Sequence, residues 1–261
     1  MTTVTAAPRP VTPTTILAAR LAVLSDGSVA LPAGLRTEIA DLAVLATGLD
    51  PYLAACTTPE SAGLSALGTR TRAQDWSGTG VEQEMLSGHL EGQLLKFLVH
   101  LTRATRVLDI GMFTGYSALA MAEALPDHGR VVACEVDERV AAFAQTSFDA
   151  SAHGHKIDVR VGTAADTLMS LDDPFDVVFL DADKAGYAGY LDTVLRRGLL
   201  AEHGVMCVDN TLMQGLPWSG SPTAVGEAIA GFNAAVQADP RVEQVVVPLR
   251  DGVTLIRRVN A

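Results

Sequence analysis

The stretch LDIGMFTGYS, residues 108–117, is a short apolar run followed by a glycine-punctuated turn and the start of a helical pattern. Glycines at 111 and 115 would let the backbone approach a ligand closely, because no Cβ atom intervenes. Their spacing differs from the Gly-x-Gly-x-x-Gly pattern of dinucleotide-binding turns, which disfavours a nicotinamide cofactor. The stretch therefore predicts an α/β fold with a nucleotide-like cofactor beside this turn. The alternative is a turn that uses glycine for its geometry alone.

Short β-branched runs alternate with alanine-rich helical stretches on both sides of this turn. The predicted strands are 107–110, 131–135, 157–161, 176–180 and 205–208, and the predicted helices are 116–125, 138–150, 164–171 and 187–200. Strands this apolar, each separated from the next by one helix, are typical of a parallel sheet that is covered on both faces. The pattern predicts a doubly wound, Rossmann-like α/β fold.

The two ends of the chain have different patterns. A helix at 224–238 leads to two β runs, 242–248 and 254–259, and the Asp-Gly pair at 251–252 between them predicts an antiparallel hairpin with a tight turn. Helical spacing at 16–24, 35–45, 82–85 and 88–101 predicts an N-terminal helical cap, with a turn-rich segment at 51–80. We expect one domain over 1–261, made of a cap region (1–100) and a cofactor-binding core (101–261).

The composition is that of an ordinary globular protein with an acidic surface. The formal net charge is -11 and no run of Lys or Arg occurs, which argues against nucleic-acid or anionic membrane partners. Three cysteines without a CxxC pair argue against a disulfide framework and a thiolate zinc site, and fit a reducing cytoplasm. The N-terminus lacks the apolar core of a signal peptide, and we find no apolar stretch of ~18 residues. We expect loose order up to about Pro13.

Acidic side chains follow three of the predicted strands. Glu135 ends the second strand, where a carboxylate can accept hydrogen bonds from both ribose hydroxyls of an adenosyl group. Asp181 follows the fourth strand, and Asp209 and Asn210 follow the fifth. Ligands of an open α/β sheet bind beyond the carboxyl ends of the strands, so these side chains are expected to meet there. Each of them alone could be a solvent-facing or capping residue.

Three oxygen donors without His or Cys favour Mg²⁺, Mn²⁺ or Ca²⁺ over zinc. Asp181, Asp209 and Asn210 are therefore candidate metal ligands. Lys184 lies three residues after Asp181, and a lysine near a cation and a sulfonium could release its proton and act as a base. A solvated surface lysine is the alternative.

At these residues the sequence resembles the cation-dependent O-methyltransferases, which include catechol and caffeoyl-CoA O-methyltransferases. The resemblance covers about Met85 to Val259. It implies an S-adenosylmethionine-dependent enzyme of class EC 2.1.1 with Asp181, Asp209 and Asn210 as metal ligands and Lys184 as general base. It also implies cofactor contacts at Ser87, Asp109, Gly111, Ser117, Glu135, Ala164, Asp183 and Tyr190.

Two features disfavour caffeoyl-CoA as the substrate. Met213-Gln214 replaces the Trp-Asn pair of the caffeoyl-CoA enzymes, and no Lys or Arg occurs over 198–240 to bind the phosphates of coenzyme A. The segments TPTTILAARL, LDPYLAACTTPES and EQEMLSGHLEGQ are similar to O-methyltransferases of mycosporine biosynthesis. This similarity implies demethyl-4-deoxygadusol as the substrate and 4-deoxygadusol as the product. Another catechol or natural-product O-methyltransferase is the alternative.

Two rival classes remain on the residues alone: a nicotinamide oxidoreductase, because of the Rossmann-like layout, and a non-catalytic binding protein on the same fold. For any of these we expect a cytoplasmic homodimer whose partners are a small-molecule substrate and a second copy of the chain.

Overall fold

The computed structural model describes residues 9–220 and 223–259. Its helices are α1 (Pro13–Ser25), α2 (Ala33–Thr47), α3 (Leu49–Cys56), α4 (Ala62–Ala73), α5 (Gly88–Thr102), α6 (Tyr116–Ala124), α7 (Glu138–Asp149), α8 (Ala164–Ser170), α9 (Tyr187–Arg196) and α10 (Ala224–Ala238). Its strands are β1 (Arg106–Ile110), β2 (Arg130–Glu135), β3 (Ile157–Val161), β4 (Phe175–Leu180), β5 (Leu200–Val208), β6 (Val242–Val247) and β7 (Val253–Arg258). Short 3₁₀ turns are η1 (Gln83–Met85), η2 (Gly154–Lys156), η3 (Lys184–Gly186) and η4 (Met213–Gly215).

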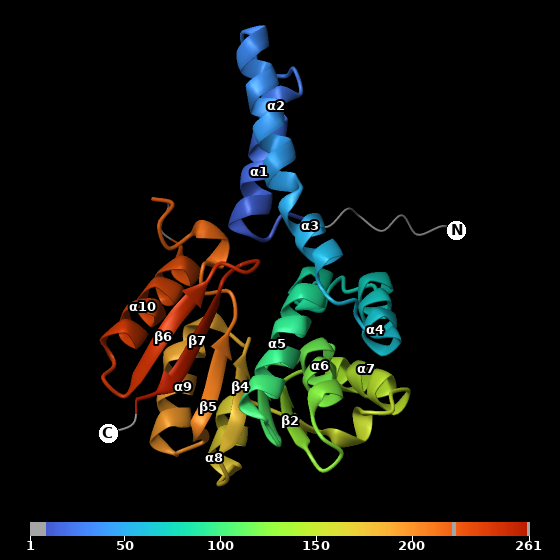
Figure 1. Cartoon of the computed structure of the whole chain (residues 1–261), viewed down its shortest axis with the longest axis vertical. Helices are drawn as coiled ribbons and strands as arrows, with labels where there is room; N and C mark the ends of the chain where they lie inside the picture. Colours follow the sequence, from blue (N-terminus) through green and yellow to red (C-terminus); the bar gives the residue numbers. More distant parts are fainter. Residues whose placement is uncertain (1–8, 221–222, 260–261) are drawn as a thin grey trace.

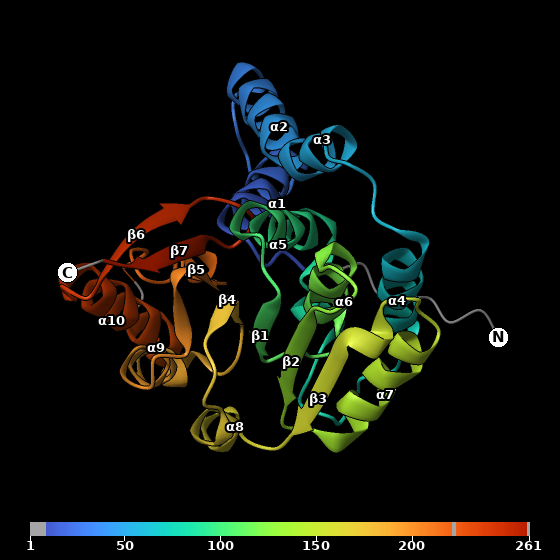
Figure 2. The same ribbon diagram turned by 60° about the horizontal axis from the view of Figure 1, so that its bottom comes forward.

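The seven strands form one twisted sheet in the order β3-β2-β1-β4-β5-β7-β6 (Figures 1 and 2). β1 to β5 pair in parallel, whereas β7 is antiparallel to both β5 and β6. β2 and β3 are added on one side of β1, and β4 and β5 are added on its other side. The strand order therefore reverses between β3 and β4, and β1 and β4 lie side by side at the centre of the sheet. The prediction of a doubly wound sheet with a C-terminal antiparallel hairpin is confirmed.

Alternating side chains of the strands build two apolar cores, one on each face of the sheet. In β4, Val177 and Phe179 pack toward α4, α5, α6 and α7, while Val178 and Leu180 pack toward α8, α9 and α10. All four side chains are fully buried. Because each face is covered by helices, β4 and its neighbours are mostly apolar, with Asp109 of β1 and Asp176 of β4 as exceptions, and this pattern is the signal that identified the strands in the sequence.

The turn after β1 needs glycine at two positions. Gly111 has φ +95° and Gly115 has φ +88°, in the left-handed region that glycine adopts at little cost. A Cβ atom at residue 111 would lie 2.4 Å from the carbonyl oxygen of Asp181, and one at residue 115 would lie 2.3 Å from the Phe148 ring. The turn can therefore lie against both the β4 loop and α7 only with glycine at these places.

The β6–β7 connection is longer than the tight turn predicted for Asp-Gly. Val247 pairs with Val253, so five residues, 248–252, connect the strands, and Arg250 has φ +51°. Backbone bonds explain the extra length: the amide of Thr211 donates to the carbonyl of Gly252 (3.0 Å), and that of Leu212 donates to the carbonyl of Asp251 (2.9 Å). The connection thus folds against the loop that follows β5.

α1 and α2 form an antiparallel hairpin that projects away from the sheet (Figure 1). Each helix buries a single apolar side chain, Ala18 in α1 and Ala43 in α2. Larger apolar side chains on the hairpin are exposed: Leu17, Val23, Leu24, Leu35, Leu42, Val44 and Leu45. The hairpin therefore presents an unusually apolar surface to its surroundings.

The prediction that no apolar stretch reaches the length of a membrane span is wrong for this region. α2 continues almost directly into α3, and the combined helix Ala33–Cys56 contains an 18-residue window with mean hydropathy 1.4 and 6% of its residues buried. By length and composition alone this helix could cross a membrane. The sequence pattern obscured it because Gly48 and Pro51 mark a turn in most contexts, whereas here Pro51 lies in the first turn of α3, where proline is tolerated.

Two further predictions at the N-terminal side need correction. α3 and α4 fall in the segment 51–80 that was interpreted as turns, and α4 is an ordered helix whose N-cap residue, Ser61, accepts a hydrogen bond from the Leu64 amide (3.1 Å). The loose order expected up to Pro13 lies in part on residues 1–8, outside the described residues. Within 9–12, Thr12 is buried and caps α1 in a reciprocal capping box with Thr15.

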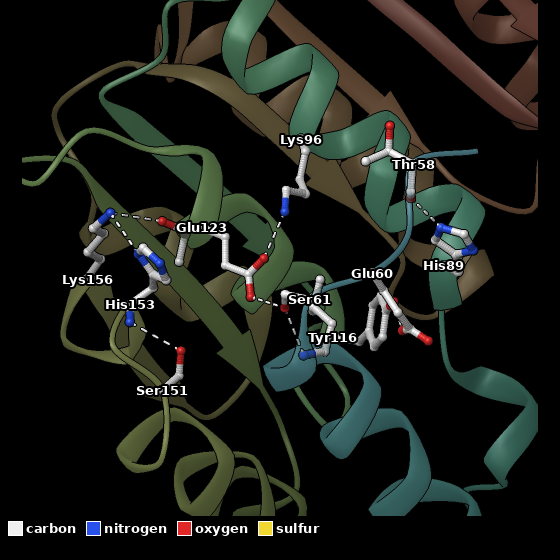
Figure 3. A network of polar contacts seen from close by, with 12 residues as sticks. Thr58, Glu60, Ser61, His89, Lys96, Tyr116, Glu123, Ser151, His153 and Lys156 are labelled. Carbon is white, nitrogen blue, oxygen red and sulfur yellow. Dashed lines mark hydrogen bonds and ion pairs between the residues drawn. The ribbon is translucent and has the colours of Figure 1, made fainter. Parts of the chain in front are cut away.

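A polar network joins α4 to the sheet domain (Figure 3). Glu123 of α6 accepts hydrogen bonds from Ser61 (2.5 Å) and from Lys96 of α5 (2.8 Å), and its side chain is nearly buried. His89 of α5 contacts the carbonyl of Thr58 (2.7 Å), and Tyr116 of α6 donates to Glu60 (2.7 Å). These contacts fix the segment between α3 and α4 on α5 and α6.

Candidate active site

A cavity of about 600 Å³ lies beyond the carboxyl ends of β1, β2, β4 and β5. It brings together ten of the twelve residues predicted to form the site: Ser87, Gly111, Glu135, Ala164, Asp181, Asp183, Lys184, Tyr190, Asp209 and Asn210. Asp109 and Ser117 lie behind its wall. Residues from 87 to 210 thus converge on one place, as expected for the edge of an open α/β sheet.

The two predicted residues behind the wall form a buried pair. Asp109 of β1 is fully buried, and its Oδ2 accepts a hydrogen bond from the hydroxyl of Ser117 (2.7 Å). Its Oδ1 is buried without a hydrogen-bond partner among the described residues. Burial raises the pKa of Asp109 to about 7. Oδ1 of Asp109 is therefore a buried acceptor without a hydrogen-bond donor, and such atoms call for an explanation. A polar ligand beside Gly111 would supply a donor close to it.

The cofactor side of the cavity is formed by Glu135, Ala164, Asp183 and Tyr190. Glu135 accepts a hydrogen bond from the amide of Asp137 (2.9 Å), and burial raises its pKa. The hydroxyl of Tyr190 donates to Asp183 (2.5 Å), and burial, followed by this hydrogen bond, raises the pKa of Tyr190 to about 12. These contacts orient two carboxylates at the ends of β2 and β4, where an adenosyl and an amino-acid group can be bound.

An aromatic side chain that the sequence analysis did not single out completes this side. Phe113 lies in the glycine turn with φ +49° and lines the cavity. Trp76 packs on it with ring centroids 5.3 Å apart and packs also on Phe143 of α7 (5.4 Å). The Trp76 indole donates to the carbonyl of Thr71 (2.8 Å). The cofactor side therefore combines a rigid apolar surface with carboxylates, and it fits S-adenosylmethionine.

The predicted metal ligands lie on neighbouring strands. Leu180 of β4 pairs with Val208 of β5, and the next residues along each strand are Asp181 and Asp209. The amide of Asp209 donates to the carbonyl of Leu180 (3.0 Å). Asn210 follows with φ +57°, and its amide donates to Oδ1 of Asp209 (2.6 Å). The sheet register thus places all three oxygen donors at one edge of the cavity.

Negative charge accumulates at this edge. Burial and the charge of Asp181 raise the pKa of Asp209 to about 7. Glu91 of α5, which the sequence analysis missed, is also buried there, and Oε1 lacks a partner among the described residues. Burial and the charge of Asp209 raise the pKa of Glu91 well above its usual range. A charged residue at an apolar position of α5, four residues before Leu95, was the signal in the sequence.

The donor set has the chemistry of a site for a hard cation, because it offers carboxylate and amide oxygens in a place where a positive charge would offset buried negative charge. Within the part of the chain that the structure describes, no group of three or more His, Cys, Asp or Glu is arranged to hold a metal ion. This statement does not cover the predicted ligands, because Asp181, Asp209 and Asn210 include only two such residues and one amide. The residues fit a divalent cation, and the cation itself stays a prediction.

Lys184 connects the metal edge to the helix that follows. Its Nζ donates to Oδ1 of Asp181 (2.6 Å) and to the hydroxyl of Tyr187 (2.7 Å). The Tyr187 hydroxyl in turn donates to the carbonyl of Asp209 (3.1 Å). Tyr187 is fully buried, and burial raises its pKa well above the usual value. Lys184 is thus held in the cavity and is not the solvated surface lysine that was considered as the alternative.

Two further segments line the cavity without having been predicted to. The β6–β7 connection contributes Arg250 and Asp251, and Oδ1 of Asp251 accepts a hydrogen bond from the amide of Gln214 (2.5 Å). The segment before α1 contributes Arg9, Val11 and Thr12. Arg9 is bound to Glu82 by an ion pair. These residues come from both ends of the chain, and no local motif marks them.

Comparison with protein families assigns residues 61–259 to the O-methyltransferase family. Tricin synthase 2 of Oryza sativa subsp. japonica is 38% identical over 187 residues, which are 65% of this chain and 62% of the rice enzyme. Probable caffeoyl-CoA O-methyltransferase 2 of Dictyostelium discoideum is 36% identical over 185 residues, 67% of this chain and 78% of that protein.

Solved structures agree with this assignment. The SAH-bound Podospora anserina methyltransferase PaMTH1 superposes with a TM-score of 0.75 at 28% identity, over 90% of this chain and all of that chain. The O-methyltransferase TomG of Streptomyces achromogenes, solved in complex with SAM, superposes with a TM-score of 0.69 at 29% identity, over 82% of this chain and 96% of that chain. These matches support an O-methyltransferase and not the oxidoreductase or the non-catalytic protein considered earlier. The chain belongs to the O-methyltransferase family and is an S-adenosylmethionine-dependent O-methyltransferase.

Proposed function

We propose that the enzyme is divalent-cation-dependent and methylates one oxygen of a small molecule that carries two adjacent oxygens. The observation that carries this proposal is the placement of Asp181, Asp209 and Asn210 at one cavity edge, beside the cofactor side formed by Glu135 and Asp183. A Mg²⁺ ion is the proposed cation, with Mn²⁺ or Ca²⁺ as alternatives. Its donors are hard oxygens, as these ions require.

The proposed reaction is a direct displacement at the sulfonium methyl group of S-adenosylmethionine. The cation, when bound, would hold two substrate oxygens and make a bound hydroxyl easier to ionise. Ser87, Glu135, Asp183 and Tyr190 hold the cofactor, and orientation of the two reactants supplies much of the rate enhancement. Lys184, whose Nζ lies in the cavity 2.6 Å from Asp181, would take the hydroxyl proton after losing its own proton to solvent beside the bound cation.

The proposed substrate is demethyl-4-deoxygadusol, which would be converted into 4-deoxygadusol in mycosporine-like amino acid biosynthesis. It rests on the similarity to mycosporine-pathway enzymes that we infer from the sequence of the N-terminal segments. Thr12, the first residue of the segment TPTTILAARL, lines the cavity together with its neighbour Val11. Met213 and Gln214, the pair that departs from the caffeoyl-CoA enzymes, line the cavity as well. A catechol or another natural product with adjacent oxygens is the second candidate.

The substrate proposal is tested by measuring kcat/KM with S-adenosylmethionine and Mg²⁺ for demethyl-4-deoxygadusol, a plain catechol and caffeoyl-CoA. This ratio compares transition-state binding among competing substrates. We expect demethyl-4-deoxygadusol to be the best substrate, caffeoyl-CoA the poorest, and the catechol intermediate. A higher value for caffeoyl-CoA or for the catechol would contradict the mycosporine assignment and leave the methyltransferase activity in place.

We further propose a homodimer in the cytoplasm, with a small-molecule substrate and with neither nucleic acid nor membrane as partner. The exposed apolar side chains of the α1–α2 hairpin, such as Leu17, Val44 and Leu45, support association between copies. Light scattering after size exclusion measures the assembly, and a monomer at micromolar concentration would refute it. Cell fractionation tests the location. We expect the protein in the soluble fraction, whereas insertion of the helix Ala33–Cys56 into a membrane would place it in the membrane pellet.

A further inference from the structure

Three cationic side chains line the cavity, and they differ in whether they form an ion pair with a carboxylate. Lys184 lies 2.6 Å from a carboxylate oxygen of Asp181, and Arg9 forms an ion pair with Glu82. Arg250 has no direct ion pair: among the described residues, no carboxylate oxygen lies within 4.0 Å of its guanidinium, and the carboxylates of Glu91, Asp209 and Asp251 interact with its charge from farther away. A half-buried arginine in a ligand cavity without an ion pair is a ready site for an anionic group.

The backbone holds Arg250 in place at a cost. Its φ of +51° lies in the left-handed region, which is unfavourable for a residue with a Cβ atom. Backbone bonds from Thr211 to Gly252 and from Leu212 to Asp251 fix the connection in this conformation. Unfavourable backbone angles of this kind occur where the surrounding structure over-determines them, often at functional sites.

One of the five N–H donors of the guanidinium is used within the protein. Nη1 of Arg250 donates to the carbonyl of Ser87, just before α5. Gly88 makes room for this contact, because a Cβ atom at residue 88 would lie 2.9 Å from Nη1. The contact orients the planar guanidinium over the start of α5, and the remaining donors are available to a ligand in the cavity.

Arg250 lies where the substrate side of the cavity meets the cofactor side, because its backbone belongs to the β6–β7 connection and its guanidinium contacts Ser87. The β6–β7 connection is bonded to the loop after β5, which carries Asn210, Met213 and Gln214. Glu135 and Tyr190, which belong to the cofactor side, lie at the ends of β2 and in α9. A group that met Arg250 on the side of the loop after β5 would belong to the methyl acceptor, and the contact with Ser87 makes cofactor binding a necessary control.

We infer that Arg250 binds an anionic oxygen of the methyl acceptor, so that the substrate class is an acid, a carboxylate or an enolate, that also carries two adjacent oxygens. This inference rests on the proposed function. It adds to it that the acceptor is recognised at two places: its adjacent oxygens at Asp181, Asp209 and Asn210, and its negative charge at Arg250. A guanidinium can bind a carboxylate through two parallel hydrogen bonds, which a neutral amide of the same shape cannot reproduce.

The test compares 3,4-dihydroxybenzoate with its neutral isostere 3,4-dihydroxybenzamide on the full-length enzyme. We expect the wild type to favour the acid in kcat/KM. Arg250→Met should raise KM for the acid by about 10-fold or more, and should leave KM for the amide nearly unchanged, since a charged hydrogen bond is worth roughly 1.5–3 kcal/mol. Arg257→Met, on the exposed face of β7 where Arg257 pairs with Glu243, is the matched control and should change neither.

Because Arg250 also contacts Ser87, the dissociation constant of S-adenosylmethionine is measured for each variant. Arg250→Lys keeps a positive charge and one donor, and should retain cofactor binding but lose part of the preference for the acid. Equal losses for acid and amide in both variants, or no preference in the wild type, would overturn the inference. If neither compound is methylated but demethyl-4-deoxygadusol is, the proposed function stands; if none of the three is methylated, it fails. Calorimetric binding of acid and amide to the protein with S-adenosylhomocysteine then still decides the role of Arg250.

Discussion

Nζ of Lys184 lies 2.6 Å from Oδ1 of Asp181, so the proposed base and a proposed metal ligand share one ion pair. Both side chains are largely shielded from solvent, with 17% and 16% of their surface exposed. A cation bound at Asp181 would compete with the lysine for this carboxylate and release Nζ toward the substrate. Cation binding and proton transfer are thereby linked in the proposed site.

The first prediction concerns the cation. Asp181→Asn should lower both activity and the affinity for Mn²⁺ by more than about 100-fold, since metal sites lose at least 10- to 100-fold even when residues behind the ligands are changed. Chelator should abolish wild-type activity and Mg²⁺ should restore it. Electron paramagnetic resonance of bound Mn²⁺ measures the affinity. Asp173→Asn, whose side chain is 73% exposed, is the control. Full activity in excess chelator would refute cation dependence.

The second prediction concerns the base. Lys184→Met should lower kcat for a catechol by about 10²- to 10⁴-fold, the usual contribution of a general base. The loss should be smaller for demethyl-4-deoxygadusol, because its enol is already acidic. Steady-state kinetics with both substrates measure the two losses, and the dissociation constant of S-adenosylmethionine serves as the control for folding. Equal losses with the two substrates would show that Lys184 acts by positioning Asp181 and Tyr187.

The third prediction concerns the cofactor. Glu135→Gln should weaken S-adenosylmethionine binding by about 10- to 100-fold, because a hydrogen bond to a charged group contributes roughly 1.5–3 kcal/mol. Isothermal titration calorimetry measures the change. Glu202→Gln, on the exposed part of β5, is the matched control. An unchanged dissociation constant would mean that Glu135 serves only to accept the hydrogen bond from the amide of Asp137.

The fourth prediction concerns stability and pH. Burial raises the pKa of Asp109 from 3.8 in the unfolded chain to about 7 in the folded protein. The folded state therefore binds more protons between these values, and the free energy of unfolding contributed by Asp109 is largest below pH 3.8 and falls as pH rises to about 7. The decrease amounts to at most about 4 kcal/mol, at 1.36 kcal/mol per pKa unit.

Asp109→Asn removes this dependence, because the amide does not titrate. Urea denaturation of both proteins at pH 4.5 and pH 7.5 checks it: the difference in unfolding free energy should shift in favour of the variant at the higher pH. The loss of packing or hydrogen bonding in the variant adds a constant at both pH values and cancels from the comparison. Parallel curves would show that Asp109 is ionised in the folded protein over the whole range, which would contradict the raised pKa.

The fifth prediction concerns the β6–β7 connection. Gly252→Ala should destabilise the protein by about 1–3 kcal/mol, because φ is +85° and the new Cβ atom would lie 2.3 Å from Cγ of Leu212. Thermal unfolding measures the loss. Gly189→Ala in α9, where nothing lies within 4 Å of the new Cβ atom, should be neutral or stabilising. Equal melting temperatures for the two variants would contradict the packing described for this connection.

Much of the fold could be predicted because its signal is local. β4 is buried on both faces, so residues 177–180 had to be apolar, and the turn at Gly111 had to lack a Cβ atom. The proximity of Asp181, Asp209 and Asn210 could be predicted as well, because the carboxyl ends of parallel strands lie at one edge of the sheet. α3 and α4 could not be predicted, because Pro51 and the small polar residues around Ser61 resemble turns until tertiary contacts order them.

The remaining site residues are set by contacts that no local pattern encodes. Arg250 reaches the carbonyl of Ser87 across 163 positions of sequence, and its neighbour Asp251 was recognised only as part of a turn. Arg9 lies at the start of the described chain and meets Glu82 across 73 positions. Such pairings follow from the order of strands and the length of connections, which the sequence alone leaves open.

The residues that line the cavity come from two parts of the chain, and only one of these parts is matched by the family. The family match begins at residue 61, so the cofactor side and the proposed metal ligands belong to the part shared with relatives. Arg9, Val11 and Thr12 contribute to the same cavity from outside that part. Exchanging the first 60 residues between relatives would therefore change part of the cavity lining and leave the cofactor residues and the proposed metal ligands unchanged. Chimeras joined near Ser61 could inherit their reaction from one parent and their choice of acceptor from the other.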